Sequence, residues 1–492
     1  MDLPASFADY TRALLGADDY SKLTAALNGE PPVSIRLNED KLQRSSFSLS
    51  CASALASLRR VPWSDSGFYL CGRPAFTFDP LLHAGCYYVQ EASSMFTEQA
   101  LRQHAVAGPL VMLDLCAAPG GKSILARSVL PEGSLLVSNE VIRTRAQVLT
   151  ENLTKWGHPG VVVTRNDPAD FAPLLDVFDV ILADVPCSGE GMFRKDAVAL
   201  TEWSPQSVEL CSRRQRRILT DVWPCLKPGG ILIYSTCTYN THENEENIRW
   251  LRDEFGAEVL SLHTPPVWNI TGNLLSGEDF PVYRFLPYAT EGEGFFLAAL
   301  RKPTSGGTAS LPLCENRRKC QTRESTTAGR PARQQLAAVR DWLLTPDAYE
   351  FIQEGALLRA FPKDNFPLLS VLRSSLHIMQ AGVEVAEQKG RDWLPTHALA
   401  LSTALSPDAF TRCDVDYPQA IAYLRRESLT LPATVPLGTA LLTYRGIPLG
   451  FVKHIGSRAN NLYPQEWRIR NPHLPQGASG LVEEALQSLS DT

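Results

Sequence analysis

Residues 110–122 read Leu-Val-Met-Leu-Asp-Leu-Cys-Ala-Ala-Pro-Gly-Gly-Lys, an apolar run that ends in a glycine turn. The apolar run at 110–115 predicts a buried strand, and the segment Lys122 to Leu130 predicts the helix that follows it. Gly120 and Gly121 have no side chain, so a ligand can approach the backbone of this turn closely. The first turn of the helix also presents N–H groups that have no partner within the helix. The segment therefore predicts a ligand site between a strand and a helix.

The alternation of strand and helix continues after this turn. Further apolar runs of strand length lie at 134–138, 160–164, 178–183 and 230–235, with helix-period segments between them, for example Arg143–Trp156 and Ser207–Trp223. The segment Lys227-Pro228-Gly229-Gly230 predicts a sharp break before the last of these runs. Short apolar runs that alternate with helices indicate a parallel sheet covered on both faces. We therefore predict a doubly wound, mostly parallel α/β core of the Rossmann type over residues 106–302.

The regions on either side of this core differ from it in composition. Residues 1–105 combine helical stretches with strand-like pieces, which predicts a small α+β module. From Arg301 to Arg333, eight Lys or Arg residues stand against two Glu residues, so residues 303–333 predict a basic, flexible linker. Residues 334–492 end in short apolar runs separated by glycine turns, and we expect a small β-barrel there.

Composition narrows the class of protein. The 492 residues carry a formal net charge of −6, which argues against a nucleic-acid binder, although a whole-chain sum can hide local basic surfaces. No run of about 18 apolar residues predicts a membrane helix, and the first residues lack the pattern of an export signal. The 11 cysteines are scattered, without CxxC spacing. We therefore expect reduced thiols in a cytoplasmic protein, with no metal and no membrane partner.

Acidic residues stand at the ends of three further predicted strands. Glu140 follows the second strand, where a carboxylate can bind both hydroxyls of a ribose. Asp167 follows the third strand and is placed to bind an adenine amino group, while Asp184 closes the fourth and faces the same crevice. The G-x-G-x-x-G pattern of dinucleotide sites is absent at 116–122, which disfavours NAD. The expected cofactor is therefore S-adenosylmethionine.

Two cysteines also follow strand ends. Cys187 lies in Asp-Val-Pro-Cys after the fourth strand, and Cys237 lies in Ser-Thr-Cys after the fifth. The first motif departs from the Asn/Asp-Pro-Pro-Tyr/Phe pattern of amino-group methyltransferases, and a thiol there favours chemistry at a ring carbon. Carbon 5 of a pyrimidine is a poor nucleophile until a thiolate adds to carbon 6, which is covalent catalysis. This chemistry needs one nucleophile, and position at a strand end does not rank the two thiols.

Three other segments carry weaker signals. Asn240 and Glu243 stand just before a predicted helix and indicate a capping box that fixes the turn after Cys237. The arginine pairs within 212–217 predict a helix face that either contacts RNA or is simply solvated. Near the C-terminus, cations are mixed with an aromatic residue, as on RNA-binding surfaces, in the set Lys453, Arg458, Trp467, Arg468 and Arg470.

Taken together, these segments resemble the Sun/Fmu family of RNA cytosine methyltransferases, which make 5-methylcytosine. The matching pieces are residues 89–95, 114–123, 139–140, 166–167, 184–193, 234–239 and 243–245. The resemblance covers residues from about 30 to 300, and residues 395–400 and 448–450 resemble the RsmF branch of the family more weakly. Val185 stands where Ala is common, and Thr241-His242 where Pro-Glu is common. Neither departure removes a group that the chemistry needs.

The resemblance implies roles for the candidate site residues. The thiol of Cys237 would be the nucleophile, and that of Cys187 would assist release of the enzyme from methylated RNA. Lys122 and Asp184 would lie close to the target base. The cofactor would be bound by Cys116, Ala117, Ala118, Pro119, Gly120, Gly121, Lys122, Glu140, Asp167 and Asp184.

The resemblance also implies an overall activity. We expect an S-adenosylmethionine-dependent methyltransferase core between an N-terminal RNA-binding module and a C-terminal, PUA-like RNA-binding region. The expected reaction is methylation of carbon 5 of a cytosine in RNA, with small-subunit ribosomal RNA as the first candidate substrate. Two alternatives stay open: the same chemistry on transfer RNA, or an RNA-binding ribosome assembly factor with little turnover. The presence of both Cys187 and Cys237 argues against the second alternative, because binding alone needs neither. We expect a cytoplasmic monomer.

Overall fold

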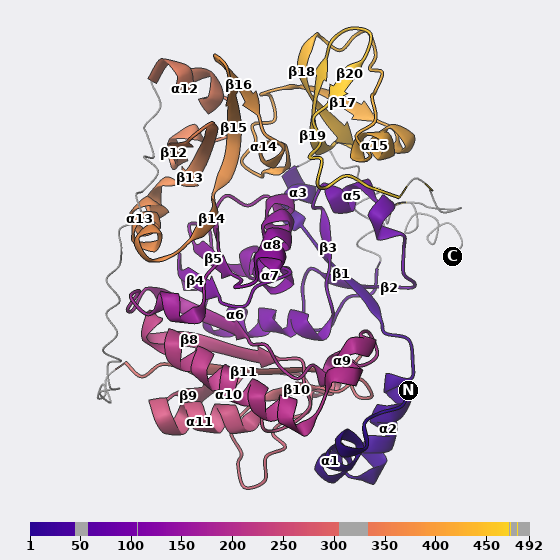
Figure 1. Ribbon diagram of the computed structural model, residues 1–492, viewed down its shortest axis with the longest axis vertical. Coiled ribbons are helices and arrows are strands. Elements are labelled where there is room, and N and C mark those ends of the chain that lie inside the picture. Colours follow the sequence, from indigo (N-terminus) through magenta and orange to yellow (C-terminus); the bar gives the residue numbers. More distant parts are fainter. Residues whose placement is uncertain (45–57, 106, 305–332, 472, 474–479, 481–492) are drawn as a thin grey trace.

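A nine-stranded sheet forms the centre of the molecule (Figure 1). The computed structural model describes residues 1–44, 58–105, 107–304, 333–471, 473 and 480. The strand order is β10-β11-β8-β7-β4-β5-β6-β14, with β9 paired to β11. The strands are β4 (Val111–Asp114), β5 (Leu135–Asn139), β6 (Val161–Thr164), β7 (Phe178–Asp184), β8 (Leu226–Thr236), β9 (Glu258–Leu260), β10 (Tyr283–Phe285), β11 (Phe295–Arg301) and β14 (Ile378–Ala381).

The pairing of these strands confirms the predicted α/β core. Strand β4 pairs in parallel with β5 and β7, β5 pairs in parallel with β6, and β7 pairs in parallel with β8. Strands β11 and β14 join the two sides of this parallel block in antiparallel orientation. The carboxyl ends of five parallel strands therefore meet along one edge, which is where the candidate residues follow in the sequence.

Helices cover both faces of the sheet, as the alternating pattern predicts. Along β7, Val180 and Leu182 belong to one apolar cluster, whereas Ile181 and Ala183 belong to the other. The first cluster packs under α6 (Thr97–His104), α7 (Gly121–Val129) and α8 (Arg143–Trp156). The second cluster packs under α10 (Pro205–Val222), α11 (Glu245–Phe255) and α13 (Phe366–Ser375). Side chains that alternate along one strand thus supply two separate cores.

Most predicted boundaries fall within two residues of the observed ones, and α8 has the predicted ends. Helix α10 begins at Pro205, earlier than predicted, because Ser204 and Ser207 form a capping box and Pro205 suits the first helical position. The predicted break at 227–230 takes the form of a bulge: β8 runs from Leu226 to Thr236, but its pairing with β7 shifts register between Leu226 and Ile231, and Gly229 has a φ of +76°.

The N-terminal region is the expected α+β module. Helices α1 (Ala5–Leu15) and α2 (Ala17–Leu27) precede a three-stranded sheet of order β2-β1-β3, followed along the chain by α6 of the core. Phe7 of α1 packs edge-on against Phe193 and Trp203, so the first helix covers loops beside the carboxyl edge of the core sheet. The remaining elements are β1 (Val33–Leu37), α3 (Glu39–Arg44), β2 (Gly67–Leu70), α5 (Pro80–His83) and β3 (Tyr87–Val89).

The C-terminal region contains two four-stranded sheets, so a barrel is too loose a description. One sheet has the order β12-β13-β15-β16 and the other β17-β18-β19-β20. Strand β14 lies between β13 and β15 along the chain, but it pairs with β6 and so belongs to the central sheet (Figure 1). The elements are α12 (Arg333–Arg340), β12 (Tyr349–Glu354), β13 (Leu357–Pro362), β15 (Val383–Lys389), β16 (Asp392–Pro395), α14 (His397–Leu401), β17 (Thr411–Val415), α15 (Tyr417–Leu424), β18 (Gly438–Tyr444), β19 (Ile447–His454) and β20 (Ala459–Asn461). The predicted linker at 303–333 lies almost entirely outside the described residues, since 305–332 are not among them.

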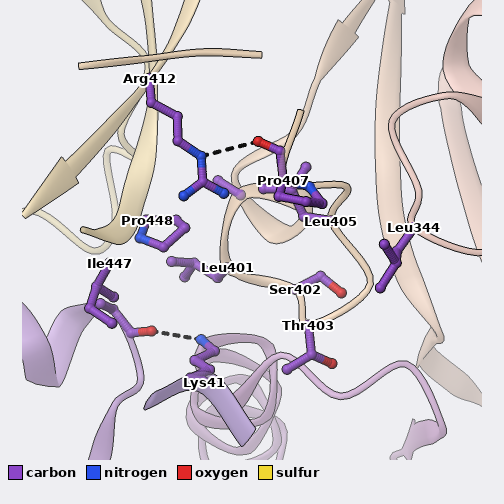
Figure 2. Close-up of a pocket in the computed structure, with 12 residues that line it drawn as sticks. Lys41, Leu344, Leu401, Ser402, Thr403, Leu405, Pro407, Arg412, Ile447 and Pro448 are labelled. Atoms are coloured by element: carbon purple, nitrogen blue, oxygen red, sulfur yellow. Dashed lines mark hydrogen bonds between the residues drawn. The ribbon is translucent and has the colours of Figure 1, made fainter. Parts of the chain in front are cut away.

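The N- and C-terminal regions meet at a cavity of about 200 Å³ (Figure 2). Lys41 lines it from the N-terminal side, while Ser402, Thr403 and Arg412 line it from the C-terminal side. The Lys41 Nζ donates to the carbonyl oxygens of Ala84 and Lys155, and burial lowers the pKa of Lys41 to about 8. The cavity thus marks a junction of three parts of the chain.

No helix among the described residues is long and apolar enough to cross a membrane.

Candidate active site

The two cysteines at strand ends come into direct contact. Strands β7 and β8 are parallel neighbours with Asp184 opposite Ser235, so the loops that follow them start side by side. The Sγ atoms of Cys187 and Cys237 lie 3.2 Å apart, both cysteines are free thiols, and both are partly buried. The contact with Cys237, together with burial, raises the pKa of Cys187 well above its usual value. The Cys187 thiol therefore keeps its proton.

A partly buried ion pair stands beside the thiols. The Nζ of Lys122 donates to Asp184 Oδ2 at 2.9 Å, and Ser235 Oγ donates to Oδ1 of the same carboxylate at 2.7 Å. Burial lowers the pKa of Lys122, but the attraction of Asp184, its hydrogen bond and smaller contributions from other groups together leave the pKa raised. The ammonium group also lies 5.3 Å from the centre of the Phe295 ring. Lys122 is therefore a fixed positive charge at the start of α7.

The glycine turn leads into α7 as predicted. Gly120 has a φ of +119°, a conformation that L side chains rarely adopt, and it is the N-cap of the helix. Ser123 Oγ donates to Asp114 Oδ2 at 2.7 Å, which joins the end of β4 to the first turn of α7. Burial raises the pKa of Asp114 to about 7, and its Oδ1 atom has no hydrogen-bond partner among the described residues. Burial also raises the pKa of Cys116, so this third thiol stays protonated.

The two other predicted acids differ in their surroundings. Glu140 is buried, and its Oε1 accepts from the N–H of Ile142 at 2.9 Å while Arg145 lies 3.3 Å from its Oε2. Val141 and Ile142, the next two residues, are apolar and about half exposed, at 53% and 49%. Asp167 instead caps the short helix after β6, accepting from the N–H of Ala169 at 3.1 Å. Its role in the local fold was not apparent from the sequence.

A buried polar network connects the loops that carry the thiols. The side-chain amide of Asn240 donates to Glu243 Oε1 at 2.8 Å and to Glu190 Oε1 at 3.0 Å. Glu243 Oε2 accepts from the N–H of Ser188 at 3.0 Å and from the Gln215 amide at 2.7 Å. Burial raises the pKa of Glu243. The 188–190 loop and the 238–243 loop are therefore held together by two carboxylates and one amide.

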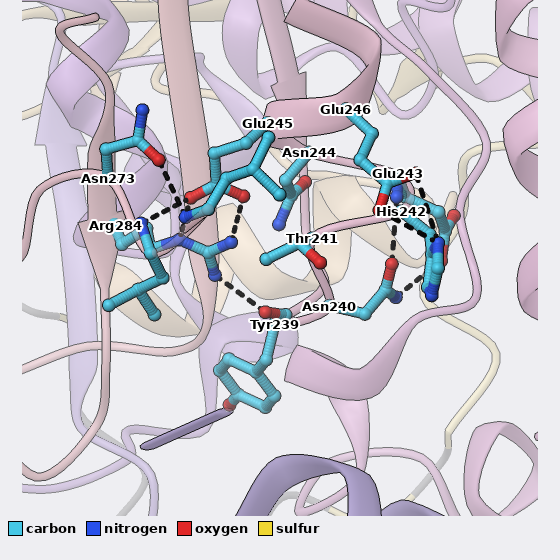
Figure 3. A network of polar contacts seen from close by, with 12 residues as sticks. Tyr239, Asn240, Thr241, His242, Glu243, Asn244, Glu245, Glu246, Asn273 and Arg284 are labelled. Carbon is cyan, nitrogen blue, oxygen red and sulfur yellow. Dashed lines mark hydrogen bonds and ion pairs between the residues drawn. The ribbon is translucent and has the colours of Figure 1, made fainter. Parts of the chain in front are cut away.

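This network corrects part of the predicted capping box. The N–H of Glu243 does donate to Asn240 Oδ1 at 2.8 Å, as such a box requires. However, the backbone N–H of Asn240 donates to Glu190 instead, and α11 begins only at Glu245. Figure 3 shows Asn240 and Glu243 turned toward each other before the helix starts. Asn240 and Glu243 therefore close a turn that ends two residues before the first residue of α11.

On the other side of this loop, a buried ion pair holds the start of α11 (Figure 3). The guanidinium of Arg284 on β10 binds the carboxylate of Glu245 and also donates to the carbonyl of Tyr239 at 2.6 Å. Both charged side chains are almost fully buried. Neither Arg284 nor Glu190 was singled out in the sequence, because their partners lie 39 and 50 residues away along the chain.

Some residues of the predicted basic surfaces are engaged within the protein. Arg213 pairs with Glu209 on its own helix, and Arg216 donates to Asn247 at 2.9 Å. In the C-terminal region, Trp467 receives the ammonium of Lys155 5.2 Å from its ring centre, so it packs against α8. Arg317-Arg318-Lys319 lies outside the described residues.

Among the described residues, no group of three or more His, Cys, Asp or Glu side chains could hold a metal.

A Rossmann-like sheet with a glycine turn and charged strand ends fits the class of Rossmann-like methyltransferases. Comparison with known proteins makes this specific. Residues 100–301 match the family model described as 16S rRNA methyltransferase RsmB/F, residues 3–92 match the N-terminal domain of RsmF, and residues 410–469 match its PUA domain. The chain belongs to this RsmF family of ribosomal RNA methyltransferases.

Relatives match nearly the whole chain. Ribosomal RNA small subunit methyltransferase F of Cronobacter sakazakii is 33% identical over 94% of this chain and 96% of its own length. The protein of the same name from Erwinia tasmaniensis is 30% identical over the same shares. Among solved structures, NSun6 from Pyrococcus horikoshii with SFG covers 62% of this chain and 99% of its own, with a TM-score of 0.50 and 21% identity. The structure titled PH0851 covers 61% of this chain and 66% of its own, with a TM-score of 0.54 and 24% identity. These last two likenesses concern the fold.

Proposed function

We propose that this chain methylates carbon 5 of a cytosine in small-subunit ribosomal RNA, with S-adenosylmethionine as the methyl donor. The observation that carries this proposal is the 3.2 Å contact between the thiols of Cys187 and Cys237 beside the glycine turn. Two adjacent thiols at parallel strand ends serve covalent chemistry on a ring carbon, which methylation of an amino group does not need. The names of the relatives, which specify the small ribosomal subunit, favour ribosomal RNA over transfer RNA.

In the proposed mechanism Cys237 is the nucleophile. Its thiolate adds to carbon 6 of the cytosine, and the displaced electron pair makes carbon 5 nucleophilic enough to take the methyl group. The proton on carbon 5 then leaves to a base or to water. The electron pair of that C–H bond restores the double bond between carbons 5 and 6, and the bond between carbon 6 and Cys237 Sγ breaks. RNA and enzyme separate with the thiolate regenerated.

The raised pKa of Cys187 gives it a distinct part in this cycle. Because Cys187 keeps its proton, its S–H group can donate to the neighbouring sulfur of Cys237 when that sulfur carries the charge. This contact stabilises the leaving thiolate in the last step, which is how Cys187 would assist release. Cys116 stays protonated and takes no part in the chemistry.

The charged pair beside the thiols would orient the target base. The carboxylate of Asp184 is held by Lys122 at 2.9 Å and by Ser235 at 2.7 Å, so its direction is fixed. The fixed carboxylate can accept from the amino group of a cytosine, and the ammonium beside it can donate to the acceptors of the ring. We assign Lys122 and Asp184 to binding of the substrate and also to binding of the cofactor.

The residues at this edge of the sheet are suited to an S-adenosylmethionine molecule, which would supply an electrophilic methyl group when bound. The buried carboxylate of Glu140 is suited to ribose hydroxyls, and the half-exposed side chains of Val141 and Ile142 offer an apolar face to an adenine ring. The turn from Cys116 through Lys122 approaches the ligand with its backbone, since Gly120 and Gly121 add no side chain. Asp167 would contribute less than Glu140, because Asp167 also caps the next helix.

The division of labour along the chain is part of the same proposal. Residues 1–105 would form an N-terminal RNA-binding module, 106–302 the methyltransferase domain, 303–333 a linker and 334–492 the C-terminal RNA-binding region. We also propose that the protein works as a cytoplasmic monomer. Native mass spectrometry of the purified full chain tests the oligomeric state, and a dimer would contradict it.

Transfer of labelled methyl groups tests the reaction. Purified protein is supplied with labelled S-adenosylmethionine and, separately, with small-subunit ribosomal RNA, small ribosomal subunits or transfer RNA. We expect label in ribosomal RNA, and bisulfite sequencing of the product locates the modified cytosine. Cys237→Ala should abolish transfer, whereas Cys116→Ala should retain it. Full activity of Cys237→Ala would overturn the mechanism, and label in transfer RNA alone would overturn the substrate. RNA binding without any label would favour an assembly factor.

A further inference from the structure

A cavity of about 370 Å³ lies at the β6 side of the central sheet and was not apparent from the sequence. It is lined by Arg143, Gln147, Arg165, His377 and Met379. Arg143 begins α8, Arg165 follows β6, and His377 precedes β14. The core and the C-terminal region therefore build this cavity together.

Backbone contacts fix the two parts of the cavity to each other. The N–H of His377 donates to Asn166 Oδ1 at 3.0 Å, and the N–H of Arg165 donates to the carbonyl of His377 at 3.0 Å. Strand β14 then pairs with β6, and Gln380 accepts from Thr154 of α8 at 3.1 Å. The cavity wall is thus an ordered continuation of the sheet.

The arginines of this cavity are not neutralised. Among the residues that the structure describes, no side chain pairs with the guanidinium of Arg143 or Arg165, in contrast to the engaged arginines of α10. The first turn of α8 contains no acidic residue. The carboxylates close by in sequence are engaged elsewhere: Glu140 with Arg145, and Asp170 with the Asn166 amide at 3.1 Å. Two unopposed guanidinium groups beside a cavity select for an anion.

The position of the cavity relates it to the thiols. In the sheet, β6 is separated from β7 by β4 and β5, so three strand spacings of about 4.8 Å put Arg165 about 14 Å along the carboxyl edge from the end of β7. Cys187 follows β7 on the same edge. The glycine turn and Glu140 follow the two strands in between. An extended ligand that delivers a base to the thiols can continue past the cofactor crevice to this cavity.

We propose that Arg143, Arg165 and His377 form a site for a backbone phosphate of the RNA substrate. This inference rests on the proposed function, because it assigns a contact to the same RNA. A guanidinium offers two parallel N–H donors to phosphate oxygens, and the cavity walls hold both arginines around one volume. The contact reads no sequence and sets the register of the RNA strand relative to the thiols.

The test compares RNA affinity at several salt concentrations. The full-length double variant Arg143→Gln/Arg165→Gln removes both charges and keeps polar side chains of similar shape. Lys363→Gln is the matched control: Lys363 is exposed near the opposite edge of the sheet, where Asn365 contacts the turn before β5. The probe is a fluorescent single-stranded RNA without cytosine, so no methyl transfer interferes. Each lost phosphate contact reduces the salt slope by about 0.7 for single strands.

Because the two arginines hold one phosphate, we expect the double variant to lose about 0.7 from the slope of log affinity against log salt. Between about 50 and 200 mM salt, the wild type should therefore lose about 2.6-fold more affinity than the double variant. Lys363→Gln should keep the wild-type slope, and the affinity of the double variant for S-adenosylmethionine, measured by calorimetry, should be unchanged. An unchanged salt slope would overturn the phosphate site, as would a loss of cofactor affinity alone. Methyl transfer by the wild type is measured separately, so failure of the proposed function is distinguished from failure of this site.

Discussion

The backbone N–H of Ser188 donates to the carboxylate of Glu243 at 3.0 Å, and this bond joins the loop after Cys187 to the loop after Cys237. The same carboxylate accepts from Gln215 and Asn240. Because the two loops emerge from neighbouring parallel strands, a small shift of either one would separate the thiols. The distance between the two sulfurs therefore depends on a carboxylate that contacts neither of them.

Glu243→Gln should loosen this arrangement. The substitution replaces a carboxylate oxygen with an amide donor, so at least one buried donor loses its acceptor, which costs about 1–3 kcal/mol of stability. We expect methyl transfer to fall at least tenfold and disulfide formation between Cys187 and Cys237 under mild oxidant to slow. Glu246→Gln is the control, since among the described residues the side chain of Glu246 pairs with the exposed His242 alone. Wild-type rates of both reactions in Glu243→Gln would contradict the positioning role.

Cys187→Ala should show that the two thiols have different functions. Without the S–H group beside it, the thiolate of Cys237 leaves carbon 6 more slowly, so the covalent complex should accumulate. Denaturing gels of protein incubated with RNA and S-adenosylmethionine measure this as a band that RNase treatment collapses. The double variant Cys187→Ala/Cys237→Ala should show no such band. Absence of the band from Cys187→Ala as well would remove the release role and leave the nucleophile assignment intact.

Asp114 should make stability fall as the pH rises. Its pKa of about 7 lies above the usual value of about 3.9 in an unfolded chain. Between these two values the folded state binds more protons at this site, so its stabilising contribution is full below pH ~4 and is lost as the pH rises to ~7. Asp114→Asn does not titrate and can still accept from Ser123. The stability of this variant relative to wild type should therefore increase from pH 5 to 7.5, measured by urea unfolding. A constant difference would exclude the shift.

The Arg284–Glu245 pair should matter more for folding than any exposed ion pair. Arg284→Ala leaves the carboxylate of Glu245 buried without its partner, and such changes cost about 3–5 kcal/mol. Arg301→Ala breaks an exposed pair with Glu258 and should cost less than about 1 kcal/mol. Urea unfolding of both variants gives the comparison. Equal losses would show that burial of the pair has no special effect.

The sequence predicts the core well because its signals are local. The apolar period of β4, β5, β6 and β7 places alternate side chains on two faces, and α8 has the predicted ends, Arg143 and Trp156. Cys187 and Cys237 were also expected at one edge, since parallel strands bring their carboxyl ends together. These features need no knowledge of which distant residues meet.

The features that escaped prediction depend on distant partners. Arg284 lies beside Glu245 because β10 pairs with β11. Asn240 lies beside Glu190 because the loops after β7 and β8 pack against each other. The same holds for the cavity at Arg143 and Arg165, to which His377 is added from a segment more than 200 residues later. A basic run such as 212–217 is visible in sequence, whereas two isolated arginines become a cluster only in space.

Strand β14 also has a consequence for the order in which the protein is made. Ile378 of β14 pairs with Thr164 of β6, although 214 positions separate them (378 − 164). During synthesis, β6 therefore leaves the ribosome long before the strand that covers its outer edge. An uncovered strand edge pairs readily with other chains. A nascent chain that ends after the methyltransferase domain therefore exposes the unpaired edge of β6. Pairing with β14, in the last third of the protein, removes this edge as a site of aggregation.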